Sequence, residues 1–257
     1  MDGSPYVIAF ANQKGGVGKT TTAVSLASCT AELGKNVLMI DCDPQGNTTS
    51  GLGINKKGLR NTSYNVLVDE KGPESCVIKT KFDRLSLVPA TIELAGAEFE
   101  LIDEDRRESR LSEFIRKLKG YDYVMIDCPP SLGMLTVNAL TAADGVVIPM
   151  QCEYYALEGL TQLMISIKKV KQLYNPRLTV AGILITMFNG RLNLSAQVLS
   201  EIKKYYSDKL FSTVIPRNVT LSEAPGFGTP INHHDRYSKG ARAYMDAAEE
   251  LIKRCPV

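Results

Sequence analysis

The stretch of sequence that decides the fold is Lys14-Gly15-Gly16-Val17-Gly18-Lys19-Thr20-Thr21. A short apolar run, 6–11, precedes it and is typical of a buried strand, while apolar positions within 20–33 recur at helix spacing. A second apolar run, 37–41, follows, so strand, helix and strand predict a βαβ unit with parallel strands. The stretch therefore predicts a glycine-rich loop between the first strand and the first helix.

This loop has the chemistry of a phosphate site. Its glycines allow successive backbone N–H groups to turn inward around phosphate oxygens, and the N-terminus of the following helix adds favourable partial charge. Lys19 is placed to reach the β and γ phosphates, and the Thr20 hydroxyl can ligate Mg²⁺. We therefore expect a nucleoside triphosphate with Mg²⁺ to be bound by Lys14, Gly15, Gly16, Val17, Gly18, Lys19, Thr20 and Thr21.

The rest of the chain continues the alternation of strands and helices. Nearly continuous apolar runs predict further strands at 85–88, 123–127, 145–149, 179–186 and 211–215. Helices are expected at 93–102, 108–119, 134–143, 157–174, 194–206 and 238–254. Strands that are apolar throughout are typical of a parallel sheet covered on both sides. The prediction is one α/β domain, residues 1–257, with a mostly parallel twisted sheet and helices on both faces.

Composition excludes several classes of protein. The chain has 257 residues, of which 44% are hydrophobic and 23% charged, as in globular proteins and unlike disordered or fibrous ones. No apolar run approaches the roughly 18 residues of a transmembrane helix. Asp2-Gly3-Ser4-Pro5 does not resemble a secretory leader, and the six cysteines form no CxxC pair, so we expect a cytoplasmic chain with reduced thiols. The net charge of +2 hides a basic excess in 151–257, a weak indication of a surface facing nucleic acid.

The loop departs from the common phosphate-binding pattern in two ways. The pattern G-x-x-x-x-G-K-[ST] has glycine where Gln13 stands, and an additional lysine, Lys14, begins the loop. With these features the loop resembles the deviant Walker A motif of the ParA/MinD family of P-loop ATPases. The resemblance implies that Lys14 crosses a homodimer interface to contact the phosphates of the partner's nucleotide. Paired lysines would offset the charge of two facing triphosphates, so nucleotide binding and dimerisation would be coupled.

Two further segments resemble the switch segments of the same family. They are Asp41-Cys42-Asp43-Pro44-Gln45-Gly46-Asn47 and Ile126-Asp127-Cys128-Pro129-Pro130-Ser131-Leu132-Gly133, and each ends an expected strand, where parallel sheets place their ligands. The resemblance implies that Asp43 positions or activates the attacking water and that Asp127 holds Mg²⁺ directly or through water. Asp41 is expected to support the metal and the switch network. The reaction implied is a slow hydrolysis of ATP to ADP and phosphate, since no histidine or other strong base stands beside Asp43.

The second half of the chain narrows the resemblance. Leu184-Ile185-Thr186-Met187-Phe188-Asn189-Gly190-Arg191 and Ile215-Pro216-Arg217-Asn218-Val219-Thr220-Leu221-Ser222-Glu223-Ala224-Pro225 closely resemble segments of chromosome-partitioning ParA (Soj) proteins. The likeness then covers essentially the whole chain. It implies that Pro216 and Asn218 border the adenine, and that Arg191 and Arg217 bind non-specific double-stranded DNA.

The resemblance also implies partners. A homodimer in the ATP state would bind DNA and associate with the nucleoid, and a ParB-type centromere-binding protein would stimulate hydrolysis and release it. Because the first strand is expected to begin near residue 6, we expect no N-terminal helix-turn-helix extension that reads an operator. Whether the cargo is a chromosome, a plasmid or another DNA element stays open.

Other classes share parts of this pattern. A MinD-like membrane-associated positioning ATPase needs a basic amphipathic tail, whereas the apolar face of the last helix is expected to dock on the sheet. A redox ATPase like the nitrogenase iron protein needs exposed thiolates for its cluster, for which Cys128 is a poor candidate before two prolines. An amide-forming P-loop ligase needs a substrate pocket that the sequence does not identify. His233-His234 lacks spaced acidic or cysteine companions, so solvated histidines are expected there and not metal ligands.

Overall fold

The structure, a computed structural model, describes residues 4–257. Residues 1–3, on which part of the expectation about a secretory leader depends, lie outside the described residues. The strands form a seven-stranded sheet in the order β3-β4-β2-β5-β1-β6-β7. All neighbours pair in parallel except β3, which is antiparallel to β4. The strands are β1 (Tyr6–Phe10), β2 (Val37–Asp41), β3 (Ile78–Lys79), β4 (Leu85–Val88), β5 (Tyr123–Asp127), β6 (Gly145–Met150) and β7 (Thr179–Ile185).

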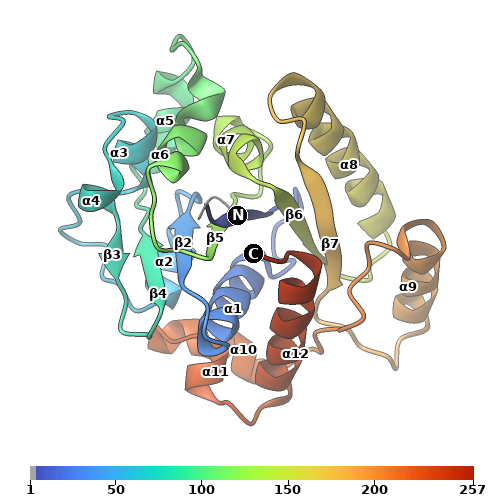
Figure 1. Ribbon diagram of the computed structural model, residues 1–257. Helices are drawn as coiled ribbons and strands as arrows, with labels where there is room; N and C mark the ends of the chain where they lie inside the picture. Colours follow the sequence, from blue (N-terminus) through green and yellow to red (C-terminus); the bar gives the residue numbers. More distant parts are fainter. Residues whose placement is uncertain (1–3) are drawn as a thin grey trace.

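Different helices cover the two faces of the sheet (Figure 1). Alternate residues of β1 show the two layers, since Ile8 packs in the core beneath α1 and α12, whereas Val7 packs in the core of the opposite layer. The first layer contains α1 (Lys19–Glu32), α10 (Val219–Glu223), α11 (Ile231–His234) and α12 (Lys239–Arg254). The second contains α3 (Ser63–Leu67), α5 (Leu94–Glu100), α6 (Arg110–Arg116), α7 (Met134–Ala142), α8 (Ala156–Leu173) and α9 (Asn193–Tyr206). The predicted α/β class is confirmed.

Several short elements were not predicted. They are α2 (Asn47–Gly51), α4 (Pro73–Cys76), the 3-10 turns η1 (Arg107–Ser109) and η2 (Ala224–Phe227), and also β3, α3, α10 and α11. Elements of two to five residues are too short to show a hydrophobic period, so the sequence gives no pattern for them. The region 108–119, predicted as one helix, divides into η1 and α6.

The prediction of a strand at 211–215 is wrong. The segment is flanked by two isolated bridges, Ile183 of β7 with Leu210 and Phe188 beyond β7 with Pro216, and it forms no regular ladder. In its middle, the backbone N–H groups of Ser212 and Thr213 donate to the carboxylate of Glu250 on α12, at 2.9 and 3.1 Å. Because these donors bond a side chain, they are not available to a neighbouring strand.

The register of the central strands sets the place of the site. β5 lies between β1 and β2, and Asp127 at its end is level with Phe10 on one side and Asp41 on the other. The glycine-rich loop begins shortly after Phe10, so it lies at the same carboxyl edge of the sheet as the two carboxylates.

The C-terminal helix docks on this scaffold as expected. Tyr244, Ala248 and Leu251 of α12 are buried in the core with α1, and Ile252 packs against the same core in part. The Tyr244 hydroxyl shares a 2.9 Å hydrogen bond with Thr22 of α1. Within residues 4–257, none of the helices combines the length and the apolar composition needed to cross a bilayer.

Candidate nucleotide site

The loop between β1 and α1 turns on two glycines in the left-handed region. Gly16 and Gly18 have φ values of +72° and +83°, which side chains disfavour, and Gly18 is the N-cap of α1. A Cβ at Gly15 or Gly16 would meet nothing within 4 Å. The loop therefore borders open space at a helix N-terminus, and the cavity there measures about 330 Å³. Phosphate groups fit such a cradle.

Lys19 is buried at the floor of this space. Its side chain lies on the first turn of α1, the residue is 7% exposed, and Nζ donates to the backbone oxygen of Lys14 at 3.2 Å. Burial lowers the pKa of Lys19, while the nearby Asp127 carboxylate acts in the opposite direction. An ammonium held in so little water gains more than a solvated one from an anionic ligand, so Lys19 is suited to phosphate.

Asp127 is buried close to Lys19 and Thr20, two residues that line this space. The residue is fully buried; its Oδ2 accepts a hydrogen bond from the Thr48 hydroxyl at 2.8 Å, and its Oδ1 has no partner. Burial, and then the charge of Asp41, raise the pKa of Asp127 to about 7. A buried, unpartnered carboxylate oxygen costs free energy unless a cation or donor reaches it. Mg²⁺ fits this position, with Thr20 lining the same cavity.

Asp41 is engaged by its own switch segment. Its Oδ2 accepts from the backbone N–H and hydroxyl of Thr49 at 2.8 and 2.6 Å, and its Oδ1 accepts from the Asp43 N–H at 3.2 Å. Burial raises the pKa of Asp41 to about 6, against the hydrogen bonds from Thr49. Both oxygens of Asp41 are thus engaged by the segment that carries Asp43 and by Thr49 of α2.

Asp43 lies between these carboxylates and the loop. It is 7% exposed and lines the phosphate cavity, and its Oδ1 accepts from the Gln45 N–H at 2.9 Å. The backbone turns at Gly46, whose φ is +62° and where a Cβ would lie 2.7 Å from the Ala90 oxygen. The side chain of Asp43 is thus held at the wall of the phosphate cavity.

Two threonines that sequence reasoning missed connect these groups. Thr48 and Thr49 are neighbours on α2, and they bond Asp127 and Asp41, respectively. The helix therefore ties both switch segments together. The signal was present in the Thr-Thr pair just after Gly46, but a five-residue helix has no pattern to reveal where those hydroxyls point.

Lys14 directly precedes Gly15, which lines the cavity, but its own side chain points to another part of the chain. Its Nζ pairs with the carboxylate of Glu153, in the loop between β6 and α8, and the two side chains are 46% and 51% exposed. Its backbone N–H donates to Asn12 at 3.0 Å. Lys14 is therefore held within its own chain, close to solvent.

Pro216 and Asn218 lie beside the loop in a second cavity of about 240 Å³. Gly18 and Thr21 line its other side, so it continues from the phosphate space. The side-chain oxygen of Asn218 is buried without a hydrogen-bond partner. An unpaired acceptor in a narrow groove next to a phosphate cradle fits a base that offers an amino group, such as adenine.

Arg191 and Arg217 lie at one edge of the site. A bridge between Phe188 and Pro216 brings their two loops side by side, and the Arg217 N–H donates to the Phe188 oxygen at 3.3 Å. Both side chains are exposed. Among residues 4–257 neither arginine takes part in an ion pair, so both are available to an external anion.

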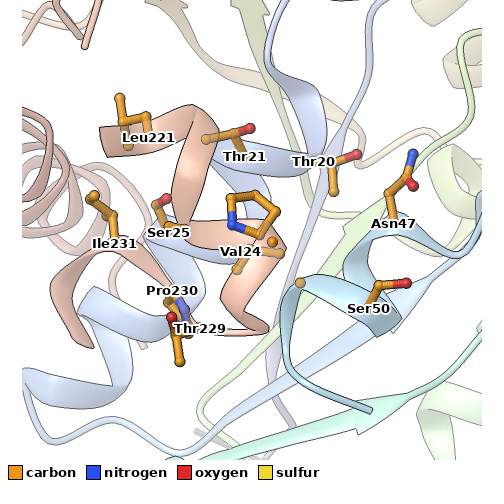
Figure 2. Close-up of a pocket in the computed structure, with 14 residues that line it drawn as sticks. Thr20, Thr21, Val24, Ser25, Asn47, Ser50, Leu221, Thr229, Pro230 and Ile231 are labelled. Carbon is orange, nitrogen blue, oxygen red and sulfur yellow. The ribbon is translucent and has the colours of Figure 1, made fainter. Parts of the chain in front are cut away.

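A third cavity, of about 440 Å³, adjoins the phosphate space and shares Thr20, Thr21 and Asn47 with it. Figure 2 shows it between Thr20 and Thr21 of α1, Asn47 and Ser50 of α2, and Ile231 of the C-terminal segment. The three cavities therefore adjoin one another along the phosphate loop and the start of α1.

Comparison with known proteins decides the family. A family model described as an AAA domain matches residues 6–180. The sporulation initiation inhibitor protein Soj of Bacillus subtilis (strain 168) is 54% identical over 246 residues, which cover 95% of this chain and 97% of that protein. This chain belongs to the ParA/Soj family of partitioning ATPases. The resemblance that the sequence suggested is confirmed over nearly the whole chain.

Solved structures agree with the family and its cofactors. A cobyrinic acid a,c-diamide synthase of Mycobacterium smegmatis, with bound ADP and magnesium, is 39% identical with a TM-score of 0.85, covering 97% of this chain and 94% of that one. A plasmid partition protein of Borrelia burgdorferi bound to AMPPNP is 27% identical with a TM-score of 0.82, covering 97% and 99%. This ParA/Soj-family protein is therefore an ATPase that uses ATP and Mg²⁺.

The other classes fit less well. The six cysteines are buried free thiols, and burial raises the pKa of Cys128, so it is not the exposed thiolate that a bridging cluster needs. His233 is exposed and His234 is half-buried, and their rings lie beside those of Phe82 and Phe227 at centroid distances of 4.7 and 4.9 Å. The diamide synthase carries the name of an amide-forming enzyme, but Soj shares more identity with this chain.

Proposed function

We propose that this ParA/Soj-family ATPase is a nucleotide-controlled DNA switch. ATP brings two copies together, the homodimer binds non-specific double-stranded DNA, and slow hydrolysis releases it. A ParB-type centromere-binding partner accelerates that hydrolysis, and the ATP state associates with the nucleoid. The observation that carries the proposal is the half-exposed side chain of Lys14, the residue directly before Gly15 of the phosphate cavity.

The proposed dimer face surrounds Lys14. Its partner Glu153 is followed by Tyr154 and Tyr155, which are 75% and 69% exposed and meet edge to face at 5.1 Å. Exposed tyrosine pairs are typical of interfaces because they bury much area at low entropic cost. When a second copy approaches with its own nucleotide, Lys14 exchanges Glu153 for the phosphates of that copy, which carry more charge.

The residues around the cavity have distinct proposed roles. The loop backbone, Lys19 and Thr21 bind the triphosphate, and Pro216 and Asn218 border the adenine. Thr20 and Asp127 hold Mg²⁺ directly or through water, which supplies charge neutralisation in phosphoryl transfer. Asp43 orients the attacking water. Asp41 positions α2, so that both switch segments respond together.

The proposed DNA contacts are Arg191 and Arg217. Both side chains are exposed, and the bridge between Phe188 and Pro216 brings the backbones of their two loops together. Contacts of this kind go to phosphates and not to base edges, so affinity should fall steeply with salt, by a log-log slope of about −0.9 per contacted phosphate. A dimer carries two such pairs, which raises avidity without a new contact.

A DNA-retention assay with ATP, ADP or no nucleotide tests the proposal. Asp43→Ala should stay on DNA with ATP, since the dimer forms but does not hydrolyse. Lys14→Ala should neither dimerise nor bind DNA, whereas Arg191→Glu should dimerise and lose DNA. Lys119→Glu, an exposed basic residue just before β5 at the opposite edge of the sheet, is the matched control and should behave as wild type. Equal retention of all variants under every condition, or a monomer at saturating ATP and Mg²⁺, contradicts the proposal.

A further inference from the structure

An exposed apolar surface on α5 lies outside the nucleotide site. Ile92, Phe99 and Ile102 are 73%, 75% and 52% exposed. Spacings of seven and three residues place them on one side of α5 and the turns that flank it. Single exposed apolar residues are common, but one on α5 and two in the turns that flank it can form a surface that a partner buries.

The segment that carries these apolar residues is strongly acidic. Residues 85–105 contain six carboxylates and no lysine or arginine. Glu100 accepts from the Tyr64 hydroxyl and Glu104 pairs with Arg110, so these two are already engaged. Glu93, Asp103 and Asp105 are exposed and form no ion pair among residues 4–257. We call Ile92, Phe99, Ile102, Glu93, Asp103 and Asp105 the α5 patch.

The α5 patch is connected to the switch that carries Asp127. On the inner side of α5, the Glu98 carboxylate lies against Gly133, where a Cβ would clash with it. Gly133 ends the switch segment and caps α7, and Glu98 Oε1 is buried there without a hydrogen-bond partner. A displacement of α5 would therefore be felt directly by the segment that starts at Asp127.

We propose that the α5 patch docks a basic amphipathic peptide segment of the protein that stimulates ATP hydrolysis. Apolar side chains of that segment cover Phe99 and its neighbours, and its lysines or arginines meet Glu93, Asp103 and Asp105, so charge complementarity selects a cationic partner. The inference rests on the proposed function only in assigning the segment to the stimulating partner. Through Glu98, the docked segment biases the position of the Asp127 switch.

A defined probe tests the docking. The probe is a fluorescent helix-forming peptide of about 16 residues with leucines on one face and lysines on the other. The control peptide has glutamate in place of every lysine. Fluorescence anisotropy with the full-length protein should show binding of the lysine peptide and not of the glutamate peptide. Phe99→Ser should weaken binding about 10-fold, as expected for a central apolar anchor. Glu93→Lys combined with Asp103→Lys should weaken it at least as much and flatten its salt dependence.

Matched controls distinguish specific binding at the α5 patch from general electrostatic attraction of the peptide to the protein. The control variants are Leu173→Ser and Asp83→Lys, which change exposed residues far from α5 in sequence. Leu173 is 69% exposed and the Asp83 side chain is 97% exposed. Both variants should bind the lysine peptide as wild type does. The lysine peptide should also change the ATP hydrolysis rate of wild type and not of Phe99→Ser. ATP-dependent DNA retention should survive in Phe99→Ser, so failure of the docking proposal is distinguishable from failure of the switch.

Three outcomes overturn the inference. One is equal affinity of the peptide for wild type and both α5 variants. A second is loss of binding in the charge variant but not in Phe99→Ser, which would mean unspecific electrostatic attraction. The third is loss of the ATP-dependent dimer in Phe99→Ser without any peptide, which would assign the α5 patch to a second copy of this chain.

Discussion

Replacing the buried carboxylate of Asp127 should stabilise the nucleotide-free protein while abolishing its hydrolysis. Burial raises the pKa of Asp127 from 3.8 to about 7. A carboxyl group whose pKa is higher in the folded than in the unfolded state stabilises the fold only while it is protonated. Its contribution to the free energy of unfolding is therefore lost as the pH rises from about 4 to about 7. Asp127→Asn removes that loss, because asparagine stays neutral and its oxygen can still accept the Thr48 hydrogen bond.

The size of the effect follows from the two pKa values. The difference between 3.8 and about 7 corresponds to a penalty of about 4 kcal/mol at pH 8 and of roughly 2 kcal/mol at pH 5. The amide NH₂ of the variant replaces the unpartnered Oδ1, and leaving it unpaired costs about 1–2 kcal/mol at either pH. We expect Asp127→Asn to be more stable than wild type by about 2–3 kcal/mol at pH 8, and nearly equal to it at pH 5.

Urea denaturation at pH 5 and pH 8, without nucleotide and with EDTA, measures this difference. Asp83→Asn is the control, because the side chain of Asp83 is 97% exposed and its replacement should not alter the pH dependence. The ATPase rate of Asp127→Asn should fall at least about 100-fold, since Mg²⁺ loses a charged ligand. A variant that is less stable than wild type at pH 8, or a stability difference that is the same at both pH values, refutes the reasoning.

Three further changes test other contacts. Glu153→Gln should release Lys14 from its ion pair and so favour ATP-dependent dimers. Analytical ultracentrifugation should show dimers at a protein concentration lower by up to about 5-fold, because an exposed ion pair contributes at most about 1 kcal/mol. Gly53→Ala should cost about 1–3 kcal/mol in urea denaturation, because φ is +77° and a Cβ would lie 2.8 Å from the Gly228 oxygen. Burial raises the pKa of Glu250, but the hydrogen bonds that its carboxylate accepts have the larger combined effect and lower the pKa. Glu250→Gln should therefore lower the free energy of unfolding by about 1–3 kcal/mol at pH 7. This loss should disappear as the pH falls below about 4, where the wild-type carboxylate is protonated.

Each of these changes has its own control or contrary result. Weaker dimerisation of Glu153→Gln would show that the carboxylate serves the interface and does not restrain Lys14. Gly58→Ala, at φ +82° with nothing within 4 Å of a Cβ, should cost only about 1 kcal/mol, and a cost equal to that of Gly53→Ala would contradict the steric argument. For Glu250→Gln, a stability loss that persists unchanged at pH 3 would exclude the carboxylate charge as its cause.

The sequence alone determined the class of the fold and the core of the site. The loop from Lys14 to Thr21 is contiguous, and the phosphate cradle depends on backbone turns and a helix start that neighbouring residues specify. The same holds for the apolar runs of the central strands, which predict a parallel sheet by their composition. Asp43 and Asp127 could be placed at the carboxyl edge because each directly follows or ends such a run.

Only the tertiary structure decided which side chains meet across long separations. Thr48 bonds Asp127 from 79 residues away, and Lys14 pairs with Glu153 from 139 residues away. Glu250 on the last helix takes the backbone donors of 212–213 and so prevents the predicted strand. Local patterns specify the type of each element but not its neighbours, because contacts between distant residues depend on strand order and on competition among hydrogen-bond partners that exists only once the chain has folded.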